Sequence, residues 1–361
     1  MLKIIIILER GVELLMKSTD NINKREIKLD GCNKVRELLK KFPKQELVVY
    51  PTPIHRLKNL EKTIGHNSLW IKRDDMTGVG IGGNKIRNLE YLLGDAVEKK
   101  CDTILFSGHI QSNLCSLAAA AARKLGLDCI SVHNDDSPKT LEGNALLNYI
   151  LGVQSIYIGE VDTDERSRQV EQISKDLIKK GKNPYIIYNG SATPLGALGY
   201  VEAAVELNEQ CLKKHINIKH VFVPAGNGGI AAGFIFGTGL LDIPFHVHVI
   251  SVENPKNELY EIIVNFKNKL EDLIGEKLSY NIDDVMTVYE NYMGEGWGCS
   301  TKESDEMIFQ LARLEGIFVE KVYTSKTVVG MVDMVKNNVI PKNESVCYIH
   351  TGGLGDLFAQ F

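Results

Sequence analysis

The sequence predicts an α/β fold of two lobes, each built on a mainly parallel open sheet that is covered by helices. Short apolar runs rich in β-branched residues alternate with longer helical stretches, as buried parallel strands and their crossover helices do. Glycine-rich turns follow several of these runs. The chain has 361 residues, more than one ordinary domain needs, which favours two lobes around a shared cleft.

The predicted elements follow one another along most of the chain. Residues 1–46 form a polar N-terminal arm with one helical patch at 35–42. The strand 69–73 leads into a glycine-rich turn at 78–83, after which a helix begins near Lys85. Further strands are predicted at 103–106, 129–132, 155–158, 184–188, 220–224 and 247–252, and further helices at 113–125, 144–151, 166–180 and 196–213. We expect a small domain at 88–189 and a large domain made of 47–87 and 190–361.

Composition excludes several classes of function. The net charge of −4 and the scattered basic residues give no reason to expect a nucleic acid or a membrane surface as partner. Seven cysteines, an odd number without a CxxC pair, argue for a reducing compartment and against a disulfide framework or a structural metal. The apolar run 2–8 is too short to span a bilayer and has no cleavage site after it. We expect a soluble cytoplasmic protein, with residues 1–15 as a start-site artefact before Met16.

The segment Gly82-Gly83-Asn84-Lys85 is the first candidate for chemistry. A lysine behind two glycines at the start of a helix lies close to open backbone and to the positive helix end. Such an amine can lose solvent and have its pKa lowered, as a Schiff-base amine requires. Taken alone, this pattern is explained better by a solvated lysine in a flexible loop.

Two further segments place polar groups between a strand and a helix. The loop Gly226–Gly229 predicts a nest of backbone amides for an anion, or simply a tight turn. A nucleotide-binding oxidoreductase fits less well, because the spacing is not GxGxxG with a downstream acid. The segment 107–113, SGHIQSN, suits a carboxylate at a helix N-terminus, although Ser112 or Asn113 could also be an ordinary helix cap.

These segments, together with 322–326 and 350–354, form an ordered set. GGNKxRxLE, SGxIQSN, the glycine loop, VYTxK and HTGG resemble the D-cysteine desulfhydrase and aminocyclopropane-carboxylate deaminase family. That family belongs to the fold-type II pyridoxal-phosphate (PLP) enzymes, related to the tryptophan synthase β subunit. The resemblance covers residues 47–358. It implies PLP as cofactor, a small amino acid as substrate, a large domain that binds the cofactor, and a homodimer.

The resemblance also implies a role for each matched position. Lys85 would carry PLP as a Schiff base, and Tyr323 matches the active-site tyrosine of the family. For the reaction itself we expect Ser112 and Tyr323 to handle protons, with a purely positional role as the alternative for either. The other implied cofactor-binding residues are Asn84, Asn113, Gly226, Asn227, Gly228, Gly229, Thr324 and Thr351. The implied substrate-binding residues are Gln111, Ser112, Asn113, Trp297 and Tyr323.

Several positions depart from the family pattern. Trp297 stands where the family has a tyrosine, and an indole cannot act as an acid or base near neutral pH. Either the pocket serves another amino acid, or Tyr292 or Tyr289 takes that place. His109 replaces a small residue, and Ile230 replaces a threonine of the phosphate loop.

Thr324 guides the choice of reaction. By the resemblance it lies where the deaminases have a glutamate beside the pyridine nitrogen and the desulfhydrases a threonine. A threonine holds that nitrogen protonated less well, which favours elimination of a good leaving group over opening of a cyclopropane ring. We therefore expect conversion of D-cysteine to pyruvate, ammonia and hydrogen sulfide. The alternatives are a deaminase, a sulfonate lyase, another PLP-dependent amino-acid enzyme such as a racemase, or a non-catalytic protein that keeps the cofactor.

Overall fold

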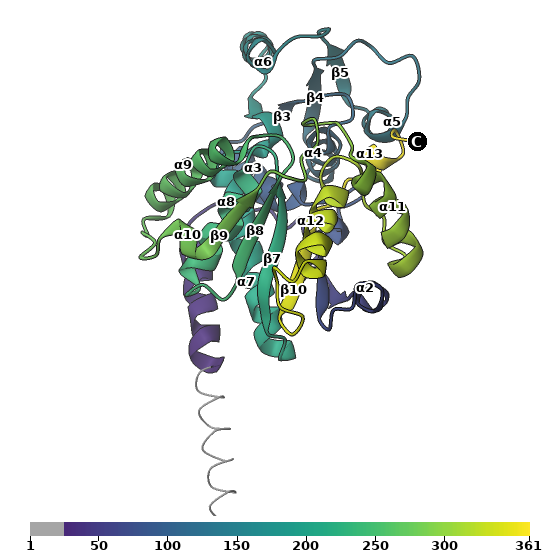
Figure 1. Ribbon diagram of the computed structural model, residues 1–361. Coiled ribbons are helices and arrows are strands. Elements are labelled where there is room, and N and C mark those ends of the chain that lie inside the picture. Colours follow the sequence, from purple (N-terminus) through teal and green to yellow (C-terminus); the bar gives the residue numbers. More distant parts are fainter. Residues whose placement is uncertain (1–24) are drawn as a thin grey trace, which may run out of the picture.

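The computed structural model describes residues 25–361. The expected start-site artefact at residues 1–15 lies outside this range. Two separate sheets, each covered by helices on both faces, confirm the predicted two-lobed α/β fold (Figure 1). Of the helical patch expected at 35–42, residues 35–39 belong to a helix that covers residues 25–39 and packs its apolar side on the large lobe, while residues 40–42 form a turn.

The large sheet has six strands in the order β1-β2-β10-β7-β8-β9, all parallel except β1. Their bounds are β1 Ile54–Arg56, β2 Leu69–Arg73, β7 Ile218–Ala225, β8 His246–Ser251, β9 Met286–Tyr289 and β10 Ser345–His350. Successive residues of a strand point to opposite faces, so each strand supplies two cores. One face is covered by α7 (Pro194–Lys214), α8 (Gly229–Leu240), α9 (Lys256–Ile274) and α10 (Ile282–Val285). The other is covered by α2 (Lys58–Ile64), α11 (Lys302–Glu315) and α12 (Thr324–Lys336).

The small sheet has four parallel strands in the order β5-β4-β3-β6. They are β3 Thr103–Ser107, β4 Asp128–His133, β5 Gln154–Tyr157 and β6 Pro184–Ile187. On one face pack α3 (Lys85–Glu98) and α4 (Asn113–Lys124), and on the other α6 (Thr163–Lys179). The short helix α5 (Gly143–Ile150) packs on α4, and α13 (Leu354–Leu357), near the C-terminus, packs on α5 (Figure 1).

The strands of the small sheet all lie between residues 103 and 187, inside the expected small domain. Helix α3 runs without a break through the expected boundary at residue 88, so it belongs to both lobes. The exact domain limits remain a prediction. Most strands predicted from apolar runs are found within a residue or two, whereas β1, β9, β10 and the helices α2, α9, α11 and α12 were not predicted.

Two further observations bear on the expected environment. Within residues 25–361, no helix combines the length and apolarity that crossing a membrane requires. All seven cysteines carry free thiols, and six of them are buried.

The connectivity gathers the candidate residues at one place. In a parallel sheet the loops that follow the strands all leave from the same edge, where ligands bind in open α/β folds. The loops after β3, β6, β7, β8 and β10 therefore face one another between the two lobes.

Candidate active site

A cavity of about 360 Å³ lies between the two lobes, at the carboxyl ends of their strands. It is lined by every residue to which the sequence analysis gives a catalytic, cofactor-binding or substrate-binding role, except Thr324. These are Asn84, Lys85, Gln111, Ser112, Asn113, Gly226, Asn227, Gly228, Gly229, Trp297, Tyr323 and Thr351. The geometry thus brings together residues that are up to 267 positions apart, and their individual roles remain predictions.

Lys85 is the first residue of α3 and its amine reaches the cavity. The turn before it needs glycine, because a Cβ on Gly82 would lie 1.9 Å from the carbonyl oxygen of Asp75. The Lys85 Nζ donates to the carbonyl oxygen of Gly190 at 2.9 Å. Burial lowers the pKa of Lys85 to about 8, although Glu253 counteracts the shift. A larger share of this amine is therefore neutral near pH 7 than of an exposed lysine.

The loop Gly226–Gly229 also lines the cavity and leads from β7 into α8. Gly228 has a φ of 74° and a Cβ there would lie 2.8 Å from the Cγ2 of Ile262, so only glycine fits this turn. The first amides of a helix have no partner within that helix. The loop and the start of α8 therefore offer free N–H groups and a positive helix end to a phosphate, as the sequence predicts.

The start of α4 forms a third wall of the cavity. Ser112 occupies the N-cap position, but its side chain makes no capping hydrogen bond, so the simple cap explanation does not account for this residue. The Oδ1 of Asn113 accepts from Asn144 Nδ2 at 2.8 Å, which leaves the Asn113 amide nitrogen to act as donor. Gln111 is held differently, since its Oε1 accepts from the backbone amide of Asn144 at 2.8 Å.

Trp297 lines the cavity, whereas Tyr289 and Tyr292, the alternatives for its place, do not. Its Nε1 donates to the hydroxyl oxygen of Tyr323 at 2.6 Å, and its ring stacks on His109 with 5.0 Å between centroids. Burial raises the pKa of Tyr323, so this phenol is protonated near neutral pH. Two of the departures from the family pattern, His109 and Trp297, thus form one stacked pair that spans the two lobes.

Thr324 does not line the cavity and is fully buried. Its hydroxyl accepts from the amide of Glu320 at 2.7 Å and donates to the Glu320 carboxylate at 3.0 Å. The same carboxylate accepts the amides of Val322 and Tyr323, which fixes the turn that begins α12. Burial raises the pKa of Glu320. A contact of Thr324 with the pyridine nitrogen remains a prediction.

The sequence reasoning missed four charged residues of the cavity wall: Arg166, Glu253, Glu320 and Asp356. Glu253 follows the carboxyl end of β8 by two residues, so the position of that strand could have revealed it. Burial, with Glu320 nearby, raises the pKa of Asp356 to about 7. No sequence motif marks Arg166 or Asp356.

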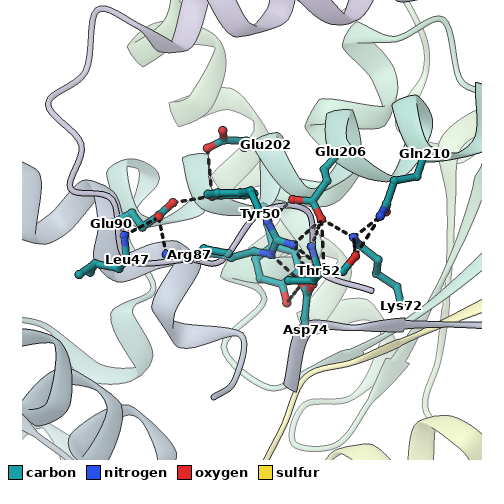
Figure 2. A network of polar contacts seen from close by, with 12 residues as sticks. Leu47, Tyr50, Thr52, Lys72, Asp74, Arg87, Glu90, Glu202, Glu206 and Gln210 are labelled. Atoms are coloured by element: carbon teal, nitrogen blue, oxygen red, sulfur yellow. Dashed lines mark hydrogen bonds and ion pairs between the residues drawn. The ribbon is translucent and has the colours of Figure 1, made fainter. Parts of the chain in front are cut away.

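A buried network of charges anchors α3 behind Lys85 (Figure 2). Arg87 is fully buried and forms ion pairs with Asp74 at 2.8 Å and with Glu206 at 3.1 Å. Lys72 pairs with the same Glu206 and donates to Gln210 at 2.7 Å. Because Arg87 lies two residues after Lys85, this network fixes the helix end that presents the amine.

The residues present fit PLP on three counts. The cavity holds a lysine amine of lowered pKa, an anion cradle of glycine amides, and a free amide donor on Asn113 for the ring oxygen. These groups come from three different loops and surround one space, as a cofactor with an aldehyde, a ring and a phosphate requires.

Comparison with known proteins agrees with this geometry. Residues 46–352 match the family model described as "Pyridoxal-phosphate dependent enzyme". A protein of Pyrococcus furiosus named "Putative 1-aminocyclopropane-1-carboxylate deaminase" is 37% identical over 90% of this chain and 96% of its own length. A protein of Pyrococcus horikoshii with the same name is 36% identical over the same shares.

Solved structures extend the comparison to the fold. The crystal structure of an ACC deaminase homologue superposes with a TM-score of 0.82 at 36% identity, over 90% of this chain and 96% of that one. Threonine deaminase isoform 2 from Solanum lycopersicum superposes with a TM-score of 0.64 at 17% identity, over 90% and 85%, which shows a shared fold alone. The chain therefore belongs to the pyridoxal-phosphate-dependent enzymes of fold-type II, in the family of aminocyclopropane-carboxylate deaminases and D-cysteine desulfhydrases.

Proposed function

We propose that this enzyme is a lyase that removes the β-substituent of a small amino acid by α,β-elimination, with D-cysteine as the first substrate to test. The observation that carries the proposal is the Lys85 amine, which has a lowered pKa and lines the same cavity as the glycine cradle. The products would be pyruvate, ammonia and the departing group.

When bound, PLP supplies an aldehyde for amines and a conjugated ring that takes up the electron pair left at Cα. The protein's own groups bind and move protons. The α4 N-terminus, with Ser112 and Asn113, is suited to hold the substrate carboxylate. The Lys85 amine, neutral in part near pH 7, is placed to accept the Cα proton. Tyr323, protonated and held by Trp297, is placed to donate a proton to a departing group.

The alternative is a deaminase that opens the ring of aminocyclopropane-carboxylate, the activity in the names of the Pyrococcus relatives. Elimination is favoured by the resemblance, which implies Thr324 beside the pyridine nitrogen where the deaminases have a glutamate; the hydroxyl proton of Thr324 is directed to Glu320. A neutral hydroxyl stabilises a protonated pyridine nitrogen less than a carboxylate would, so the ring is a weaker electron sink. That suffices for a good leaving group but less well for breaking a carbon–carbon bond.

Lys85→Ala tests the proposal. Purified protein loaded with PLP is offered D-cysteine, L-cysteine and aminocyclopropane-carboxylate, while sulfide, pyruvate and ammonia are measured. We expect sulfide and pyruvate from one cysteine enantiomer, and loss of both turnover and the visible absorbance of the bound cofactor in Lys85→Ala. Lys99→Ala, which removes an exposed lysine just after α3, serves as control and should behave as wild type. Retained cofactor absorbance in Lys85→Ala, or ammonia from the cyclopropane substrate alone, would contradict the proposal.

A further inference from the structure

Arg166 has an unusual position on α6. This helix is largely solvated, and its buried residues Arg166, Val170 and Ser174 recur every four positions. That spacing defines the stripe that faces the sheet, where an apolar side chain is the ordinary choice. Arg166 is 2% exposed, although its neighbour Arg168 lies on the solvent side of the same helix. The sequence thus places a guanidinium where a core residue belongs.

The guanidinium is poorly compensated. Among residues 25–361, its Nη1 donates to the Oδ1 of Asn134, its Nε has no partner, and no carboxylate lies within 4.0 Å. Asp135 attracts it from beyond ion-pair distance, but the Asp135 carboxylate accepts from the amide of Ile110 at 2.7 Å and contacts His109. A buried charge without a counterion is costly, so natural proteins seldom keep one that does nothing.

Arg166 lines the same cavity as Lys85 and Ser112. The charges around that cavity are divided between the lobes: Glu253, Glu320 and Asp356 come from the large lobe, and Arg166 comes from the small one. The small-lobe wall is therefore the side that attracts an anion. The substrate carboxylate already has a place at the N-terminus of α4. A second negative group on the substrate would find its partner in Arg166.

We propose that Arg166 is a specificity-determining residue, which selects amino acids whose β-substituent carries a negative charge. The inference rests on the proposed elimination and deepens it. A guanidinium forms its strongest hydrogen bonds with oxyanions such as carboxylate, sulfonate and phosphate. Among these a β-sulfonate is also a leaving group, so cysteate fits both requirements. Cysteine, with a smaller substituent, remains a poorer substrate of the same reaction.

The reaction balances without an oxidant or reductant. The Cα–H bond breaks and its proton passes to a base of the site. The electron pair forms the Cα–Cβ double bond, and the Cβ–S pair leaves with sulfite. One water then hydrolyses the released enamine and the sulfite takes up one proton, so that cysteate and water give pyruvate, ammonium and hydrogensulfite.

The test compares kcat/KM for cysteate and for cysteine, both enantiomers of each, in the PLP-loaded enzyme. We expect wild type to prefer cysteate, and the cysteate-to-cysteine ratio to fall by about 10- to 100-fold in Arg166→Gln, the size of a lost charge-assisted hydrogen bond. Arg166→Lys keeps the charge but lacks the planar set of N–H donors of a guanidinium, and should give an intermediate cysteate-to-cysteine ratio. Arg168→Gln, on the exposed side of α6, is the matched control and should keep the wild-type ratio.

The outcomes separate the two proposals. If cysteine is eliminated but the ratio favours cysteine in wild type or is unchanged in Arg166→Gln, the inference about Arg166 is wrong and the elimination stands. If neither compound is eliminated, the proposed function fails. Binding of cysteate and aspartate, followed by the rise in thermal midpoint, then decides the inference: stabilisation lost in Arg166→Gln but kept in Arg168→Gln supports an anion site, and equal stabilisation in all three proteins overturns it.

Discussion

Arg87 and Arg166 are both withdrawn from solvent, at 0% and 2% exposure, but their electrical surroundings are opposite. Arg87 makes paired hydrogen bonds to two carboxylates, Asp74 and Glu206, and a further one to Thr52 (Figure 2). Arg166 has a single side-chain partner, the neutral Asn134, among the residues described. A buried charge that has its counterions within the fold, as Arg87 has, plays a structural role. A buried charge that lacks counterions and lies at the wall of a cavity, as Arg166 does, is suited to bind an anionic ligand.

The largest expected effect lies on the Arg87 side of this comparison. Arg87→Met leaves two carboxylates buried without their main cation, which costs about 3–5 kcal/mol. We expect the free energy of unfolding to fall by that amount in urea titrations of the PLP-free protein. Arg87→Lys keeps the charge but cannot bridge both acids, and should lose less. A loss below about 1 kcal/mol in Arg87→Met would mean that the network is not a stabilising unit.

The second effect is a dependence of stability on pH. Burial alone would raise the pKa of Glu206, but Arg87 and Lys72 outweigh it and lower the pKa from 4.5 to about 2. Between these two pKa values, Glu206 is therefore protonated in the unfolded chain and ionised in the folded one. Stability from this group is complete above about pH 4.5 and is lost as the pH falls toward 2, at about 1.4 kcal/mol per pH unit.

Glu206→Gln removes this titration and should flatten the fall in unfolding free energy below pH 5. The pKa of the buried His248 is lowered by burial to about 3, so its protonation also destabilises the folded protein in acid. This contribution is the same in wild type and in Glu206→Gln. The difference between the two slopes therefore isolates Glu206. Equal slopes would show that Glu206 titrates alike in the folded and unfolded chains.

The two arginines also show how far the sequence alone can lead. Lys85, Ser112 and the loop Gly226–Gly229 follow from the rule that ligands bind where parallel strands end, because each motif lies between a predicted strand and a helix. The partners of Arg87 do not follow, since Glu206 is 119 positions away on α7 and meets it only when α3 and α7 pack. Pairing of charges is a property of the packed chain and leaves no local pattern.

The same reason explains what was missed at the cavity. The bond from Trp297 to Tyr323 depends on a loop held by Lys326, whose Nζ donates to the carbonyl oxygen of Met293 at 2.7 Å. The hydroxyl of Thr324 meets Glu320 because α12 begins with a turn that the Glu320 carboxylate closes. A sequence motif identified Tyr323 and Thr324 but could not say which groups their side chains bind.

The smallest expected effect concerns Arg166. Its replacement by an apolar residue should leave the free energy of unfolding unchanged or raise it, whereas the same replacement of Arg87 should lower it. Arg166→Met removes a buried charge that has no counterion and leaves only Asn134 without its donor. The desolvation cost that disappears and the hydrogen bond that is lost nearly cancel, so we expect unfolding free energy within about 1 kcal/mol of wild type or above it. Added aspartate at 100 times its dissociation constant should stabilise wild type by about 2.7 kcal/mol and Arg166→Met by much less. If Arg166→Met instead loses as much stability as Arg87→Met, the guanidinium of Arg166 is a structural cation like that of Arg87, and the contrast between the two sites disappears.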